Sequence, residues 1–253
     1  MIIRGDCFTP FVLGGCFMDV QKFNKIRSSN PFMPLNDIVY ELLLRDIISF
    51  RLQPGTRISE NAISQELNIS RSPVKTALEK LVSRRFASII NNRYYISNFD
   101  PEYYKEISDF TMMVEPFAAR QAAKNITPEQ LQELYRLSDK LAALYQEAYA
   151  TGKDFGFTKL LDHEMDFHYG VVKASGNSLI SSLYEEHKFE VWRFRSCLLY
   201  SRPEGFFTTV DTDHKLICDI LKLGDSDLAA AVVKRHLQVS SDSIERYELL
   251  SRF

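Results

Sequence analysis

The chain has 253 residues, of which 45% are hydrophobic and 25% charged, and its formal net charge at pH 7 is -2. This length suits one small domain and one larger domain with its own core. The four cysteines form no C-x-x-C pair, and the chain is too large to need disulfide staples. No apolar run reaches the roughly 18 residues that a membrane-spanning helix needs. We therefore expect reduced thiols and no membrane partner.

Charge is distributed unevenly along the chain. Residues 1–99 hold 13 Lys and Arg against 8 Asp and Glu, whereas residues 100–253 hold 18 against 25. A basic N-terminal part suits contact with phosphates, and an acidic remainder is repelled by them. An ordinary solvated surface is the simpler explanation of the acidity.

Residues 1–33 match no other pattern in the chain, and we expect a partly disordered N-terminal extension. Their start contains Asp6 and little basic character, which makes a poor signal peptide and predicts a cytoplasmic protein. The next domain, residues 34–99, begins with a helix that ends near Phe50. After a turn, Ser59 is placed to cap a short second helix.

The segment 66–81 predicts a third helix, capped by Ser70 and with Pro73 in its first turn, where a missing N–H costs little. Four apolar residues recur at i, i+3, i+4 and i+7 and form a stripe that faces a core: Val74, Ala77, Leu78 and Leu81. Arg71, Ser72 and Lys75 lie off this stripe on the first two turns, where a recognition helix meets base edges and phosphates. A capped core helix is also common, so this segment alone favours DNA binding only slightly.

Two β-prone runs follow, at residues 87–90 and 94–97. The residues between them are Asn91, Asn92 and Arg93, and Asn tolerates the positive φ that a tight hairpin turn demands. The hairpin would be a wing, so the domain is predicted to be a winged helix-turn-helix.

The order of residues in this domain resembles the GntR family of bacterial transcription regulators. The resemblance rests on Leu52-x-Pro54-Gly55-x-x-Ile58-Ser59-Glu60, followed by Leu67-x-x-Ser70-Arg71-x-Pro73-Val74-x-x-Ala77-Leu78-x-x-Leu81. It implies that a double-stranded DNA operator is contacted by two groups of residues, Ser70, Arg71, Ser72 and Lys75 from the recognition helix and Asn92 or Arg93 from the wing. Lys75 stands where many members have Arg, which favours a phosphate contact over a bidentate grip on guanine. Arg85 and Asn92 stand at positions often held by Gly.

Residues 100–253 are helical in pattern throughout. The expected helices, separated by breaks that pair Gly with Asn, Asp or Pro, are 101–124, 128–149, 155–175, 178–200, 206–223 and 226–250. The second domain is therefore predicted to be an all-α bundle of about six helices, and the whole protein to be mainly α.

Three of the five histidines could converge in this bundle. Glu164 and His168 are four residues apart, so they share one face of a helix. His214 lies ten residues before Gly224 and His236 twelve after it, or about 15 Å and 18 Å along two helices, so an antiparallel hairpin would bring both imidazoles to nearly the same level. One carboxylate with three imidazoles suits Zn²⁺, Ni²⁺, Mn²⁺ or Fe²⁺. Hydrogen-bonded core histidines and a simple i,i+4 pair are the alternatives.

The same region resembles the FCD effector domain of the FadR branch of GntR regulators. The matching residues are Glu164-x-x-Phe167-His168, Ala174-Ser175-Gly176-Asn177, Asp213-His214, Gly224-Asp225-x-x-x-Ala229, His236-Leu237 and, earlier, Val114-Glu115-Pro116-x-Ala118-Ala119. The resemblance implies that Glu164, His168, His214 and His236 are the metal ligands, with Glu164 in place of the usual Asp. Six helices rather than seven would indicate the VanR-like subgroup.

An inward-facing guanidinium in the bundle could bind a carboxylate effector in bidentate fashion. Arg193 and Arg195 are two residues apart and point in different directions, and we favour Arg195. The predicted function is a homodimeric regulator whose bundle binds a small organic acid at a metal site and modulates operator binding. The alternative is a metal-dependent hydrolase fused to a DNA-tethering module, although no separate general base is recognisable beside the predicted ligands.

Overall fold

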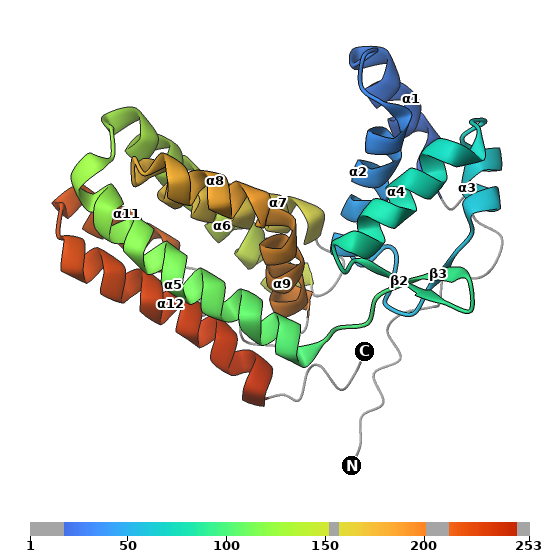
Figure 1. Ribbon diagram of the computed structural model, residues 1–253. Coiled ribbons are helices and arrows are strands. Elements are labelled where there is room, and N and C mark those ends of the chain that lie inside the picture. Colours follow the sequence, from blue (N-terminus) through green and yellow to red (C-terminus); the bar gives the residue numbers. More distant parts are fainter. Residues whose placement is uncertain (1–17, 152–156, 201–212, 247–253) are drawn as a thin grey trace. The chain divides into compact units, whose positions relative to one another are not determined.

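The computed structural model describes residues 18–151, 157–200 and 213–246 (Figure 1). The chain folds as two compact units, Met1–Asn98 and Phe99–Phe253. Both the winged helix-turn-helix and the all-α bundle that the sequence predicts are present. Within the described residues, no helix combines the length and the apolar composition that crossing a bilayer demands.

The first unit contains four helices and a small sheet in its described part. The helices are α1 (Val20–Ser29), α2 (Leu35–Ile48), α3 (Glu60–Glu66) and α4 (Arg71–Ser83). The strands are β1 (Arg57–Ile58), β2 (Ala87–Ile90) and β3 (Arg93–Ile96), in the antiparallel order β1-β3-β2. Strand β1, which is two residues long, was not predicted.

Helix α4 has the predicted buried stripe, because Val74, Ala77, Leu78 and Leu81 are all fully buried. The Ser59 hydroxyl caps α3 by accepting a hydrogen bond from the N–H of Ala62 at 3.3 Å. Ser70 occupies the N-cap position of α4, but its side chain makes no capping hydrogen bond. The predicted position of the cap is confirmed, and the predicted hydrogen bond is wrong.

The wing closes through a two-residue turn. Ile90 pairs with Arg93, and the intervening Asn91 and Asn92 have φ values of 50° and 56°. Two consecutive residues with positive φ give a turn whose twist matches that of the strands. The second strand therefore begins at Arg93, one residue earlier than predicted.

Residues 20–29 of the predicted N-terminal extension form helix α1. Asp19 caps it by accepting from the N–H of Lys22, and Phe23 is completely buried. The backbone N–H of Met18 donates to Glu66 Oε2 at 2.9 Å, which ties the start of this segment to the end of α3. The expected disorder can apply only to residues 1–17, which lie outside the described residues.

The second unit contains seven helices in its described part. They are α5 (Pro101–Asn125), α6 (Pro128–Thr151), α7 (Phe157–Ala174), α8 (Ser178–Glu186), α9 (Lys188–Tyr200), α11 (Asp213–Leu223) and α12 (Ser226–Arg246). Helix α5 is central, since it packs along α12 and also against α7 (Figure 1). The core of the bundle lies between these helices.

The single helix predicted over residues 178–200 is wrong, because the helix is interrupted at His187. No Gly or Pro marks this break. The His187 ring instead packs against Phe110 of α5, with ring centroids 5.6 Å apart, and such a contact between distant residues leaves no local pattern. The helix count therefore no longer supports the VanR-like subgroup.

Candidate functional sites

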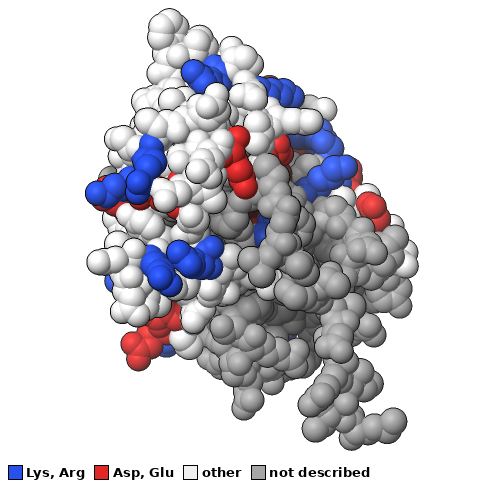
Figure 2. Space-filling model, turned by 90° about the vertical axis from the view of Figure 1, so that its right-hand side faces the viewer, with Lys and Arg blue, Asp and Glu red and all other residues white. Residues whose placement is uncertain are grey.

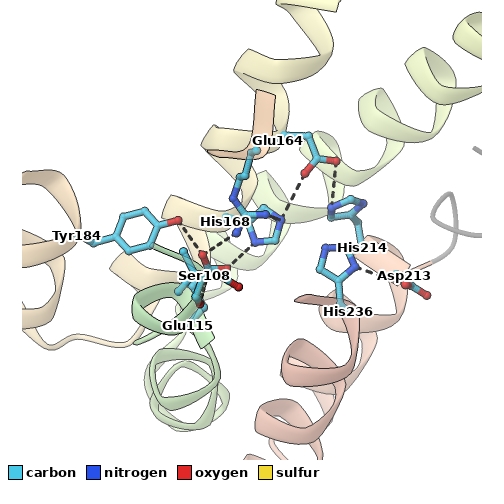
Figure 3. Close-up of polar contacts among 10 residues, drawn as sticks. Ser108, Glu115, Glu164, His168, Tyr184, Asp213, His214 and His236 are labelled. Carbon is cyan, nitrogen blue, oxygen red and sulfur yellow. Dashed lines mark hydrogen bonds and ion pairs between the residues drawn. The ribbon is translucent and has the colours of Figure 1, made fainter. Parts of the chain in front are cut away.

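The four predicted metal ligands lie together inside the bundle (Figure 3). Helix α7 contributes Glu164 and His168, α11 contributes His214 and α12 contributes His236, and all four are buried. One nitrogen from each histidine lies within 4.8 Å of the others. The turn between α11 and α12 passes through Gly224, at φ 78°, so the expected helical hairpin is present.

Glu164 lies beside two of these histidines. Its carboxylate oxygens are 3.4 Å from His168 Nε2 and 3.5 Å from His214 Nε2. The hydroxyl of Tyr145 donates to the same carboxylate. Burial raises the pKa of Glu164, but the neighbouring His214 and His168 hold the pKa well below its usual value. The group is therefore an anionic oxygen donor at neutral pH.

Two further carboxylates, from Glu115 and Asp213, contact the Nδ1 atoms of His168 and His236 and so orient these imidazoles. Glu115 Oε2 is 2.8 Å from His168 Nδ1, and Asp213 Oδ2 is 3.4 Å from His236 Nδ1. A carboxylate at Nδ1 favours the tautomer with its proton there, which leaves Nε2 unprotonated and able to bind a metal. Burial lowers the pKa of His236 to about 4, despite the opposing contact with Asp213. The imidazole is therefore neutral at pH 7.

His214 shows a feature that a metal would explain. It is 1% exposed, and within the described part of the chain neither ring nitrogen has a partner in hydrogen-bond geometry, since Nε2 only approaches the Glu164 carboxylate at 3.5 Å. A buried polar atom without a partner is costly, and a coordinated cation would satisfy the nitrogen that faces Glu164. The donor set of three imidazole nitrogens and one carboxylate oxygen fits a first-row divalent metal.

Glu115 connects this cluster to the predicted effector residue. Its Oε1 accepts from Arg195 Nη2 at 2.6 Å and from the Tyr184 hydroxyl at 2.9 Å. Burial raises the pKa of Glu115, but Arg195 and His168 together lower it to about 2. Sequence reasoning placed Glu115 only within a family pattern and missed this role. The available signal was a charged residue between the apolar Val114 and the helix-interior Pro116.

Arg195 faces the cluster and Arg193 does not. Both are buried, and Arg195 Nη1 is 3.0 Å from His168 Nε2. The Arg193 guanidinium instead lies over the ring of Phe99, 5.0 Å from its centroid. The two side chains point in different directions, as expected for residues two apart on a helix.

The predicted DNA-binding residues are exposed: Ser70, Arg71, Ser72 and Lys75 on α4, and Asn92 and Arg93 on the wing. Arg71 pairs with Glu60 of α3 at 3.0 Å, and Lys75 lies 3.8 Å from Glu79. Such exposed pairs are weak and can exchange for phosphates. Figure 2 shows basic side chains spread over one face of the molecule with acidic ones between them.

Two family models match the chain. The model "Bacterial regulatory proteins, gntR family" matches residues 35–93, and the FCD domain model matches residues 106–239. The first covers the helix-turn-helix and the wing as far as the start of β3, and the second covers most of the bundle with all four predicted ligands. The matches identify a transcription regulator rather than an enzyme, and nothing among them supports the hydrolase alternative.

Several transcription regulators are similar in sequence to this protein over most of its length. The HTH-type transcriptional repressor RspR of Escherichia coli is 30% identical over 86% of this chain and 92% of its own. The gluconate operon transcriptional repressor of Bacillus subtilis is 25% identical over 82% and 84%. In fold, the chain is similar to E. coli McbR/YncC, with a TM-score of 0.68 at 19% identity over 85% of this chain and 99% of that one. The chain therefore belongs to the GntR family of transcriptional regulators and carries an FCD effector domain.

Proposed function

We propose that this regulator is a cytoplasmic homodimer that senses a small organic acid at a divalent metal held by Glu164, His168, His214 and His236. The observation that carries the proposal is the convergence of three buried imidazoles within 4.8 Å, one of which has no hydrogen-bond partner among the described residues. Four protein ligands leave one or two coordination positions for the acid. Zn²⁺, Ni²⁺, Mn²⁺ and Fe²⁺ are the metals that suit this donor set.

The metal proposal is tested by elemental analysis of protein purified without an affinity tag. Wild type is expected to contain close to one metal ion per chain, and the double variant His214→Ala, His236→Ala to contain none. His163→Ala is the matched control, because His163 lies on α7 next to Glu164 but outside the cluster, and it should keep the metal. Wild type that takes up none of the four metals would contradict the proposal.

For operator recognition, we propose that Arg71 and Ser72 meet base edges while Ser70, Lys75, Asn92 and Arg93 contact the backbone or groove. The support is their exposure at the start of the recognition helix and on the wing. Lys75→Ala should weaken binding about equally for all sequences and reduce its salt dependence, as loss of a phosphate contact does. Arg71→Ala should instead change sequence preference, and footprinting of selected duplexes would distinguish the two results.

The effector is proposed to present a carboxylate to both the metal and Arg195. Gluconate is the first acid to assay, because two relatives at 25% identity are gluconate operon repressors. The acid would act by favouring one arrangement of the DNA-binding domains, so its differential affinity for the two arrangements limits how far operator binding shifts. Isothermal titration with and without bound metal tests whether the acid binds at the cluster.

A further inference from the structure

The contact between Arg195 and His168 has a consequence for the order in which metal and effector bind. A neutral imidazole has one N–H donor and one acceptor nitrogen. His168 Nδ1 faces the Glu115 carboxylate at 2.8 Å, and Nε2 faces Arg195 Nη1 at 3.0 Å. Carboxylates only accept and guanidinium groups only donate. At Nε2 the Arg195 contact, 3.0 Å, is shorter than the 3.4 Å to the Glu164 carboxylate, which lies outside normal hydrogen-bond length. We therefore place the proton of His168 on Nδ1, with the lone pair of Nε2 accepting a hydrogen bond from Arg195.

The same lone pair is the one that a metal needs. Nε2 of His168 is the nitrogen that lies 3.4 Å from Glu164 Oε2, and Nδ1 is already committed to Glu115. One lone pair cannot both accept from Arg195 and bind a cation. Metal binding at His168 and the hydrogen bond from Arg195 therefore exclude each other.

Arg195 cannot leave the site when this hydrogen bond breaks. Its side chain is buried, and Nη2 is held by Glu115 Oε1 at 2.6 Å. Only the Nη1 end is released, and it remains next to the metal cluster. A buried cationic N–H without an acceptor is unfavourable, so the metal-loaded protein has an unfilled demand for an anionic oxygen at this point.

We propose that Arg195 is a metal-gated effector anchor. Without metal, its Nη1 is occupied by His168. With a metal held at this cluster, the His168 lone pair would be occupied, and Nη1 would be free to donate to a carboxylate oxygen of the effector. This inference rests on the proposed metal site. It adds that metal and carboxylate bind with positive coupling, and by linkage each tightens the other by the same factor.

The test measures Zn²⁺ affinity by competition with a chromophoric chelator, in acetate and in chloride at equal ionic strength. The informative variant is Arg195→Lys, which keeps a positive charge opposite Glu115 but lacks the planar fork whose two nitrogens, Nη1 and Nη2, contact His168 and Glu115 separately. It should bind Zn²⁺ about tenfold more tightly than wild type in chloride, since a charged hydrogen bond no longer competes. It should also lose the increase in Zn²⁺ affinity that acetate produces in wild type.

Arg193→Lys is the matched control, because Arg193 is equally buried on the same helix but lies over Phe99; it should behave as wild type. Thermal unfolding checks that each variant is folded. If Arg195→Lys is not, Arg195→Gln, which leaves the Glu115 carboxylate in place behind His168, replaces it with the same expectation. Unchanged Zn²⁺ affinity in the folded variant, or an acetate effect that persists in it, overturns the gated anchor. Wild type that fails to bind Zn²⁺ overturns the metal site itself, which is a separate result.

Discussion

At the scale of single residues, Glu115 is the residue on which the buried polar network depends. It accepts from Arg195 and Tyr184 through one oxygen and faces His168 with the other. Glu115→Ala would leave a buried guanidinium without its counter-ion, which costs about 3–5 kcal/mol. Glu106→Ala, an exposed carboxylate on the same helix, should change the free energy of unfolding by less than about 0.5 kcal/mol. The free energy of unfolding of both variants is measured in urea. Similar decreases in the two variants would show that the polar network does not stabilise the fold.

The same carboxylate predicts a dependence of stability on pH. The pKa of Glu115 in the folded protein, about 2, is lower than the ordinary value of 4.5. Its contribution to the free energy of unfolding is therefore fully present above pH 4.5 and is lost as the pH falls toward 2. The difference in urea midpoint between wild type and Glu115→Gln should shrink between pH 6 and pH 3. A difference that stays constant over that range would rule out this source of acid sensitivity.

Asn92 combines a conformational role with a predicted DNA contact, and one substitution separates them. Its φ of 56° is one that glycine adopts without strain, and Asn followed by Gly is the preferred pair in this type of turn. Asn92→Gly should therefore change the free energy of unfolding by less than about 0.5 kcal/mol, because relief at positive φ is offset by the greater freedom of glycine in the unfolded chain, while operator affinity falls with loss of the side-chain contact to DNA. Asn92→Ala, which lacks both the contact and the tolerance of positive φ, should lower both quantities. Thermal melts and gel-shift titrations provide the two measurements.

At the scale of elements, the turn between α11 and α12 sets the relative level of His214 and His236. Gly224 has a φ of 78°, and a Cβ built there would lie 3.6 Å from the Ala123 carbonyl oxygen, so there is space but the backbone conformation is strained for other residues. Gly224→Ala should cost about 1–2 kcal/mol and loosen metal binding, whereas Gly224→Asn should cost less because Asn tolerates positive φ. If urea unfolding shows an equal decrease in stability for both variants, the cause is steric crowding by the added side chain rather than backbone strain at positive φ.

The helices of the bundle also show which parts of the candidate site could be predicted from the sequence. The spacing of Glu164 and His168, and the distances of His214 and His236 from the turn, are properties of regular helices, so the amino-acid order is enough to place each pair together. That the two pairs meet in one cluster was implied by the resemblance to FCD domains. The break at His187 and the bridge from Glu115 to Arg195 depend on packing between helices that are far apart in the sequence. Such contacts leave no periodic signal. Helix α1 was missed because its single fully buried contact residue, Phe23, forms no apolar stripe.

At the scale of the whole molecule, the predicted homodimer requires a surface that the described residues leave uncovered. Helices α5 and α8 pack together and carry exposed apolar side chains: Met113 at 66%, Phe117 at 45%, Leu179 at 77% and Leu183 at 38%. Apolar residues gathered on two adjacent helices are typical of association sites. We expect this surface to form the dimer interface of the bundle.

Phe117→Glu should therefore shift sedimentation equilibrium toward monomer, since an isologous interface places the new charge on both sides. Leu216→Glu is the matched control, because Leu216 on α11 is also 45% exposed but lies outside the α5 and α8 surface. The monomeric variant should still bind a single operator half-site weakly. It should lose the additional affinity of a two-fold-symmetric operator, which comes from linking two binding domains rather than from new contacts. A Phe117→Glu protein that remains dimeric would place the interface elsewhere on the chain.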